Sequence, residues 1–218
     1  MSQDLKDLKA EVAQLKEQVA ALSRTQDYLE IWKLQSRYAH LYFMMRNSEI
    51  PSLFAKKTPG ISMDIEDAGI YEGMTGVKRF WNNVLSEQRY KGTPGWLAVH
   101  MTCNPIIEIN KDGTEARGLW FSHGSVSGLR NGKLDCMSCL GKYDMDYVKE
   151  DGKWKFFRLA YRIVYMYPLG SNWVDEPITG SIAGLADNKP DKPATNYLPY
   201  SRYRINIFPP PPPEPYDD

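Results

Sequence analysis

Residues 133–166 read KLDCMSCLGKYDMDYVKEDGKWKFFRLAYRIVYM and predict two long strands joined by a tight turn. Aromatic and β-branched side chains recur through both halves, as is typical of strands. Between the halves stands Glu150-Asp151-Gly152, whose Asp-Gly pair is a strong signal for a hairpin turn. The stretch therefore indicates a long antiparallel β-hairpin.

The same succession of strands and turns extends upstream. Further strands are predicted over 97–109 and 114–126, with turn signals at 111–113 and 130–132. A helical pattern covers 26–47, and a strand over 61–66 and a short helix over 76–86 follow it. Helices followed by an antiparallel meander predict an α+β fold in which a curved sheet wraps around the helices. The concavity between sheet and helix is the expected ligand pocket.

Residues 1–24 carry a separate, heptad pattern. Apolar residues recur at alternating spacings of three and four, at Leu5, Leu8, Val12, Leu15, Val19 and Leu22. This spacing is typical of a coiled coil, and the narrow apolar stripe favours self-association. The competing interpretation is an amphipathic helix folded back on its own domain. We expect a homo-oligomer, and the composition of the stripe is compatible with a dimer or a trimer.

The composition changes again after Tyr167. Proline and glycine become frequent, and the chain ends in a run of prolines followed by Glu214-Pro215-Tyr216. Recurring aromatic residues argue against simple disorder. We expect residues 168–218 to form an extended arm, laid over its own pocket or a neighbouring subunit, beside a domain at 25–167 and a coiled-coil helix at 1–24. The proline run could alternatively bind a proline-recognition domain.

Charge and composition exclude several classes of function. The 218 residues include 27 basic and 27 acidic side chains, so the formal net charge is zero. No basic run favours a nucleic acid or an anionic membrane, and no apolar segment predicts a membrane span. The first residues do not resemble a signal peptide. These features predict a soluble, cytoplasmic protein whose partners are small, apolar or aromatic molecules.

The three cysteines do not predict a redox or metal site. Cys136 and Cys139 have the spacing of a redox motif, but they lie in a predicted strand rather than at a helix N-terminus. Their odd separation points the two sulfur atoms to opposite strand faces. Further ligands for a metal are also lacking, so no metal is expected.

His100 and Tyr38 are the candidate catalytic residues. His100 lies in a predicted strand facing an apolar interior, and Tyr38 falls on the inward stripe of the upstream helix. Histidine has a pKa of about 6.5, so it is largely neutral at pH 7 and can accept a proton. Tyrosine stays protonated and can donate to a developing oxyanion or a leaving hydroxyl. A structural histidine satisfied by a backbone carbonyl is the competing interpretation.

Other side chains are expected at the same pocket because of their place on the predicted elements. Strand alternation puts residues 102 and 104 on the face of His100, and residues 120 and 122 on the corresponding face of the next strand. An aspartate on the strand over 61–66 could orient His100, or could simply be exposed. The candidate substrate-binding residues from these patterns are Tyr42, Phe43, Asp64, Asn104, Trp120 and Ser122.

A resemblance to a known family rests on the order and spacing of four segments: Arg37-Tyr38-Ala39-His40, residues 64–73, residues 100–106, and Ala116-Arg117-Gly118-Leu119-Trp120. Together these segments resemble the SnoaL-like families of the nuclear-transport-factor-two-like fold, and they are most similar to the bile-acid 7α-dehydratase group. The resemblance covers roughly residues 25–166. It implies a cone-shaped α+β barrel with a deep apolar pocket, oligomers, and cofactor-free lyases or isomerases.

The resemblance also implies roles for individual residues. The tyrosine of the first barrel helix and the histidine of the pocket strand fall on Tyr38 and His100. The two carboxylates of that group are missing: the helix aspartate falls on Phe43, and the strand aspartate falls near Gly124. The arginine of the last strand is matched by Arg162, one position out of register, which adds Arg162 to the substrate-binding candidates.

The sequence therefore predicts a cofactor-independent lyase that acts on a hydroxylated aromatic or polycyclic molecule in aromatic compound catabolism. A carbon–oxygen dehydratase is the first hypothesis. The alternative enzyme is a carbon–carbon lyase that releases formaldehyde from a diarylpropane-type lignin fragment. A third hypothesis, from a different class, is a pocket that binds a small ligand without turning it over, or an oligomeric adaptor.

Overall fold

A curved, unclosed β-sheet packed against one long helix forms the body of the protein. The computed structural model describes residues 3–87, 92–130, 133–178 and 187–216. The sheet follows the order β2-β1-β7-β6-β5-β3, and β4 also pairs with β5. Pairs of named strands are antiparallel except β1 with β7. The elements are α1 (Gln3–Phe43), β1 (Ser62–Ile65), β2 (Gly69–Glu72), α2 (Gly73–Arg79), β3 (Leu97–His100), β4 (Cys103–Ile109), β5 (Glu115–Arg130), β6 (Lys133–Glu150) and β7 (Lys153–Pro168).

The long hairpin predicted from the sequence is confirmed as β6 and β7, which pair from Glu150 and Lys153 to Met137 and Pro168. Asp151 and Gly152 both have positive φ angles, as the turn requires. β5 pairs with β6 along the same length. The turn predicted at 130–132 falls partly on residues 131–132, which lie outside the described residues.

The prediction of one continuous strand over 97–109 is wrong, because residues 101–102 interrupt the strand and divide it into β3 and β4. Both pieces pair with β5, β4 over Ala116 to Phe121 and β3 over Gly124 to Ser127. A bulge between Cys103 and Ile106 adds a second irregularity. Breaks and bulges of this kind bend a sheet, and here they let β3 turn toward the helix. The short β2 and a 3-10 helix over Asn47–Leu53 were not predicted.

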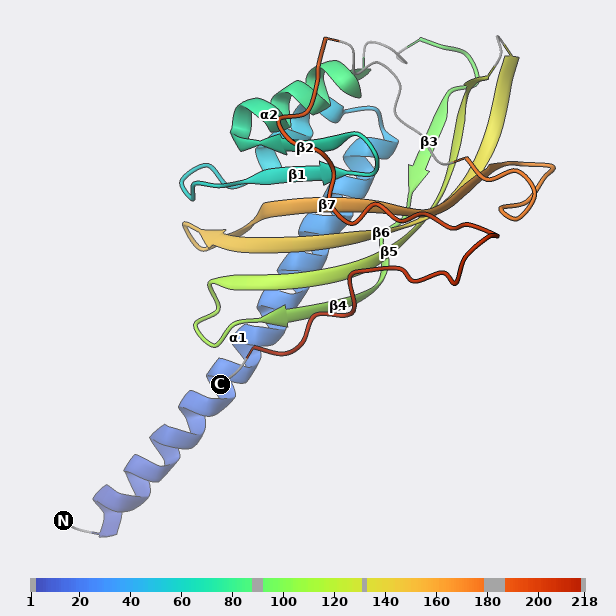
Figure 1. Ribbon diagram of the computed structural model, residues 1–218. Coiled ribbons are helices and arrows are strands. Elements are labelled where there is room, and N and C mark those ends of the chain that lie inside the picture. The colour runs from blue at the N-terminus through green and yellow to red at the C-terminus, as the bar shows by residue number, and fades with distance from the viewer. Residues whose placement is uncertain (1–2, 88–91, 131–132, 179–186, 217–218) are drawn as a thin grey trace.

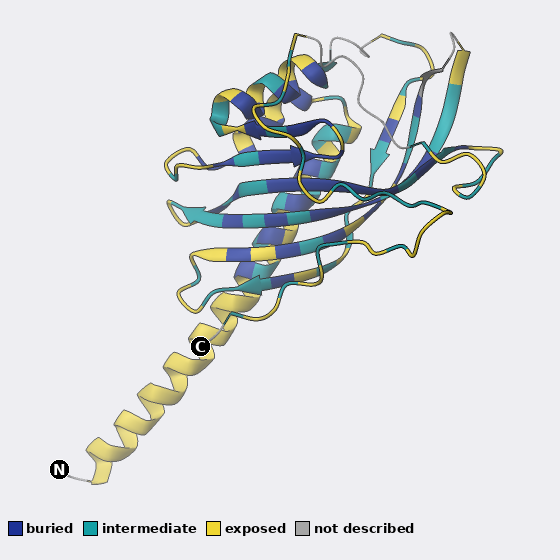
Figure 2. Ribbon diagram, viewed as in Figure 1, coloured by how far each residue is buried: buried dark blue, intermediate teal, exposed yellow. Residues whose placement is uncertain are grey.

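The helix α1 has two parts with different surroundings. Its C-terminal part lies against the concave face of the sheet, where Asp27, Ile31, Gln35 and Tyr38 are buried (Figure 1). Asp27 accepts hydrogen bonds from Lys149 Nζ at 2.5 Å and Trp154 Nε1 at 2.9 Å. Residues 3–26 are all exposed and project beyond the sheet (Figure 2). The alternative in which this segment folds back on its own domain is therefore wrong.

The C-terminal arm lies on the outer face of its own sheet, opposite α1 (Figure 1). Its described residues after β7 form no helix or extended strand. Lys142 Nζ donates to the carbonyl oxygens of Phe208 and Pro210 at 2.8 and 2.7 Å, and the Tyr200 amide donates to Val164 O at 2.7 Å. Of the arm's described residues, Ile178 alone lines the cavity described below. The Phe208 and Pro210 carbonyls contact Lys142 on the outer face of the sheet, whereas Tyr216 lines a surface pocket together with Tyr28 of α1.

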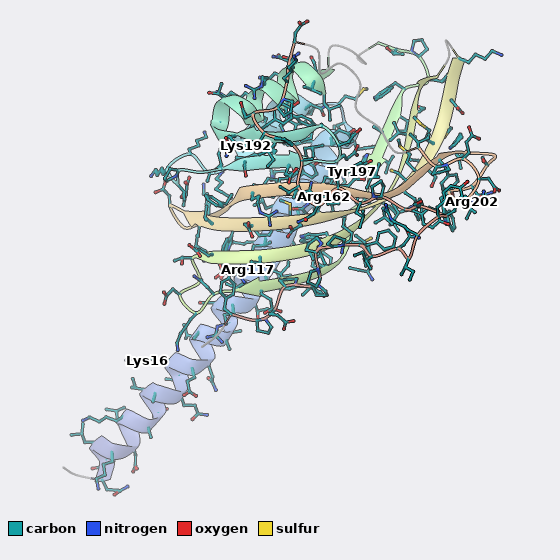
Figure 3. All side chains as sticks on the ribbon, in the orientation of Figure 1. Lys16, Arg117, Arg162, Lys192, Tyr197 and Arg202 are labelled. Carbon is teal, nitrogen blue, oxygen red and sulfur yellow. The ribbon has the colours of Figure 1, made fainter. Side chains whose placement is uncertain are left out.

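A buried ion pair fastens the arm to the sheet. The Arg162 guanidinium contacts the Asp64 carboxylate and donates to Thr195 Oγ1 of the arm at 3.0 Å, and Arg162 and Asp64 side chains are 7% and 6% exposed. Figure 3 shows Arg162 on the face of the sheet along which the arm runs. Thr195 also contacts the Asp64 carboxylate through its hydroxyl.

Among the described residues, no helix is long and apolar enough to cross a membrane.

Replacing Arg162 by methionine should destabilise the protein strongly, because the Asp64 carboxylate would remain buried without its cation. Breaking such a pair costs about 3–5 kcal/mol, and urea unfolding would measure the loss. The control is Arg37→Met on the exposed face of α1, which should change the unfolding free energy by less than about 1 kcal/mol. Equal effects of the two variants would show that the pair does not hold the arm.

Candidate active site

A deep, largely aromatic cavity lies between the sheet and the C-terminal part of α1. Its volume is about 400 Å³, large enough for a drug-sized molecule. Apolar and aromatic side chains dominate the wall, and few titratable groups reach it. The groups that bear on chemistry are Tyr38, Tyr42, Glu66, His100, Tyr143 and Tyr161.

His100 reaches the cavity from the end of β3. Its ring lies edge-on to Tyr42 and Tyr161, with ring centroids 5.1 and 5.4 Å apart. The residue is partly exposed as a whole, but its Nδ1 is buried and has no hydrogen-bond partner among the described residues. Burial lowers the pKa of His100 to about 4, because the charged imidazolium is poorly solvated there. The imidazole is therefore neutral at pH 7 and can accept a proton.

Gly124 allows His100 to take this position. The two residues are directly opposite each other in the β3–β5 pair. A Cβ atom at residue 124 would overlap the Val99 carbonyl oxygen and touch Cys139 Sγ. A side chain at this position would therefore push β3 away from β5.

Three tyrosines form the inner wall next to His100. The hydroxyl groups of Tyr38 and Tyr143 share a hydrogen bond of 3.1 Å, and the rings of Tyr143 and Tyr161 lie 4.7 Å apart. Burial raises the pKa of all three phenols, so they stay protonated at physiological pH. In the Tyr38–Tyr143 pair one hydroxyl donates to the other, which leaves one proton available to a bound oxygen atom.

Glu66 is a carboxylic acid in the same cavity that the sequence reasoning missed. Its Oε2 is buried without a hydrogen-bond partner in the described part of the chain, and the residue is 5% exposed. Burial, together with the nearby negative charge of Asp67, raises the pKa of Glu66 to about 8. At neutral pH the side chain is therefore a neutral acid that can donate a proton.

The backbone explains why Glu66 points inward. In a regular strand it would share the outward face of Asp64, two residues earlier. β1 ends at Ile65, however, and Glu66 has a φ angle of +44°, in the left-handed region that non-glycine residues rarely adopt. Its amide donates to Tyr161 O at 2.8 Å, which holds this conformation. A strained residue of this kind is often found at functional sites.

Only some of the predicted site residues meet at the cavity. Tyr38, His100 and Tyr42 line it together. Trp120 and Ser122 are fully buried but do not reach its wall, and Trp120 Nε1 donates to Tyr147 Oη at 2.9 Å. Phe43 is 46% exposed at the end of α1, and Asn104 is exposed with φ of +48° beside the bulge in β4.

Asp64 and Arg162 do not reach the cavity. Both belong to the ion pair under the arm, on the other face of the sheet. A substrate-binding role for either residue, and an orienting role of Asp64 toward His100, therefore conflict with this geometry. The alternation of β1 explains the outward direction of Asp64, since its neighbours Met63 and Ile65 are in the core.

A metal site is not evident among the described residues, where no group of three or more His, Cys, Asp or Glu side chains is placed to hold an ion. Cys139 is buried at the cavity wall, and burial raises the pKa of its thiol to about 12. A thiol with so high a pKa is a poor nucleophile. His100, Glu66 and the tyrosines are the groups of this site that can transfer protons.

Comparison with known proteins assigns the family. A SnoaL-like domain matches residues 23–160, more than half of the chain, so the protein belongs to the SnoaL-like family. The family inferred from the sequence is confirmed. No curated protein matches the chain.

Solved structures share the fold at low sequence identity. The hexachlorocyclohexane dehydrochlorinase LinA-type3 from Novosphingobium barchaimii LL02 is 22% identical with a TM-score of 0.55, over 72% of this chain and 99% of that one. A putative scytalone dehydratase from Novosphingobium aromaticivorans is 17% identical with a TM-score of 0.51, over 75% and 99%. An NTF2-like protein with a cystatin-like fold from the same species is 13% identical with a TM-score of 0.52, over 69% and 90%. The predicted α+β fold is confirmed.

The Glu66→Gln variant should lose less stability than the wild type as the pH rises. Because the pKa of Glu66 is raised from 4.5 to about 8 on folding, the folded state retains a proton that the unfolded state releases. Stability is therefore lost between pH 4.5 and 8, by about 4–5 kcal/mol in total. Urea unfolding at pH 5 and pH 9 measures this difference for each protein.

The matched control is Glu72→Gln, which changes an exposed glutamate on β2. It should follow the wild type at both pH values. An identical loss of stability between pH 5 and pH 9 in the wild type and Glu66→Gln would mean that Glu66 is already ionised at low pH.

Proposed function

We propose that the protein is a cofactor-independent lyase that removes water from a hydroxylated aromatic or polycyclic small molecule. The main support for the proposal is that a neutral imidazole, His100, and a neutral carboxylic acid, Glu66, line the same aromatic-walled cavity. Elimination needs a base and an acid at the same time, and these two groups are in the required protonation states over the same pH range.

The proposed reaction begins when His100 takes a proton from a carbon next to the carbon that bears the hydroxyl group. The electrons of the C–H bond form the new double bond, and the C–O bond breaks. The leaving oxygen takes the proton of Glu66 and departs as water. Tyr38 and Tyr143 donate a hydrogen bond to a substrate oxygen as charge develops on it. Transfer of the proton from His100 back to Glu66 through solvent restores the site.

The fold relatives support an elimination. Two of them are described as a dehydrochlorinase and a putative dehydratase, names that denote the loss of a small molecule from neighbouring atoms. Aromatic side chains around the cavity suit a flat or polycyclic substrate. Glu66 supplies a carboxyl group at the site, although the helix aspartate of the dehydratase group that the sequence resembles falls on Phe43 and the strand aspartate falls near Gly124.

One observation favours the formaldehyde-releasing alternative. No carboxylate accepts a hydrogen bond from His100 Nδ1 in the described structure, so nothing raises the basicity of the ring. Removing a hydroxyl proton demands less of a base than removing a proton from carbon. In that reaction His100 deprotonates a hydroxymethyl group, the C–C bond breaks to release formaldehyde, and the neighbouring hydroxyl leaves as water with the proton of Glu66.

Turnover by the purified protein should depend on His100. A 1,2-diarylpropane-1,3-diol and a hydroxysteroid serve as probes, with water loss followed by mass spectrometry and formaldehyde measured directly. His100→Gln should lower kcat/KM by about 10²–10⁴-fold, the usual effect of losing a general base. The control, His123→Gln, changes an exposed histidine and should retain activity.

Formaldehyde from the wild type would favour the second reaction, and water loss without formaldehyde the first. Retention of a probe with no product at all would contradict both reactions and favour a binding module.

The rate of either reaction should have a bell-shaped dependence on pH. The pKa of His100 is about 4 and that of Glu66 about 8, so kcat/KM should rise through the first value and fall through the second. The profile is measured with the faster of the two probes. In Glu66→Gln the residual activity should lack the fall near pH 8. A wild-type rate that keeps increasing above pH 9 would show that ionised Glu66 is the active form.

A further inference from the structure

The projecting part of α1 exposes an apolar stripe along its whole length. The stripe residues are between 42% and 69% exposed, namely Leu5, Leu8, Val12, Leu15, Val19 and Leu22. Residues 3–26 extend about 36 Å along the helix axis. Most helical stability in proteins comes from the packing of an amphipathic face, and the exposed residues 3–26 have no such packing in the described structure. A partner that covers the stripe would stabilise the helix.

The apolar stripe and the residues that pack on the sheet lie on different faces of the helix. Leu29 lies seven residues after Leu22, continues the stripe and is 51% exposed. Ile31, by contrast, is fully buried in the body of the protein. The two residues are separated by two positions, or about 200° around the helix axis. The sheet covers one face of the helix, and the stripe lies on the other. A partner helix can therefore pack along the stripe without contacting the sheet.

The apolar residues of the stripe indicate the number of strands. In the heptad notation abcdefg, Leu5, Val12 and Val19 take the a positions and the d positions are all leucine, at Leu8, Leu15 and Leu22. β-Branched residues at a together with leucine at d favour two strands in a parallel coiled coil. Two of the three a residues are β-branched and every d residue is leucine, a composition that favours a dimer.

The charged residues beside the stripe indicate the direction of the partner. The g positions carry Asp4 and Glu11, and the e positions carry Lys9 and Lys16. Lys16 extends from the projecting part of α1 (Figure 3). In a parallel pair each g residue faces the e residue five positions later on the other helix. Asp4 then faces the partner's Lys9, and Glu11 faces the partner's Lys16.

An antiparallel pair would place g beside g and e beside e. Over the full stripe it would bring Lys9 beside the partner's Lys16 and leave Asp4 and Glu11 facing the uncharged g residues Thr25 and Gln18, so neither opposite-charge pair would form. We propose that residues 3–29 of two copies of this chain form a parallel, in-register, two-stranded coiled coil. The charge pattern is self-complementary, so the occupant of the stripe is a second copy and not a different helix.

Cysteine cross-linking of the full-length protein tests the alignment. In a parallel, in-register pair the two copies of a d residue lie side by side, so Leu8→Cys should form a disulfide between chains under mild oxidation. Ala10→Cys, at the outward f position of the same turn, is the matched control and should not. The wild type gives the background from its three native cysteines.

Nearly all Leu8→Cys chains should run at twice the chain mass of 25.0 kDa on a non-reducing gel. A plateau at roughly two thirds would indicate three strands, because a disulfide joins only two of three chains, and would overturn the two-stranded assignment. Absence of the cross-link, or equal cross-linking of Ala10→Cys, would overturn the parallel pairing.

Charge reversal tests the choice of partner. In the Leu8→Cys background, Lys9→Glu/Lys16→Glu and Asp4→Lys/Glu11→Lys should each reduce cross-linking at least several-fold, and mixing the two variants should restore it. Lys6→Glu/Arg24→Glu makes the same change of charge outside the g and e positions and should cross-link normally. Unchanged cross-linking of both reversed variants, or no recovery on mixing, would contradict the self-complementary pairing.

Discussion

The site depends on an apolar cavity that no lysine or arginine of the described residues lines. Burial disfavours the charged form of every group, so it raises the pKa of Glu66 and lowers that of His100. The result is a protonated acid and a deprotonated base in one cavity. Two arginines of the sheet are paired on its other face, where Arg162 contacts Asp64 and Arg158 contacts Asp144 at 2.9 Å. A cation inside the cavity would ionise Glu66 and remove the acid.

The fold maintains this separation through the two faces of one sheet. Tyr143 and Tyr161 point into the cavity from β6 and β7, while Arg162, the next residue, points out to the arm. The arm runs along the outer face of the sheet, and α1 lies against the inner one (Figure 1). Gly141 has a specific role in this arrangement, because a Cβ atom there would overlap the Tyr161 ring.

Much of this organisation follows from sequence periodicity. Alternation and Asp-Gly turns predict the hairpins, and helical spacing places Tyr38 inward, because both patterns depend on regular backbone geometry. Two of the errors occur where the backbone is irregular. The positive φ angle of Glu66 turns its side chain from the outer face of the sheet toward the cavity. The bulge in β4 takes Asn104 away from the face of His100. Arg162 was placed at the pocket by resemblance, although its strand parity is outward. A glutamate at the end of a short strand is the only signal of Glu66 in the sequence.

The protonation of Glu66 is the central claim, and it can be measured directly by carbon-13 NMR of protein labelled at the glutamate carboxyl groups. The account predicts one carboxyl resonance that titrates near pH 8 and is missing from Glu66→Gln, since the pKa of Glu66 is raised to about 8 by burial. Titration of every glutamate carboxyl below about pH 5, the ordinary range for this side chain, would contradict the account.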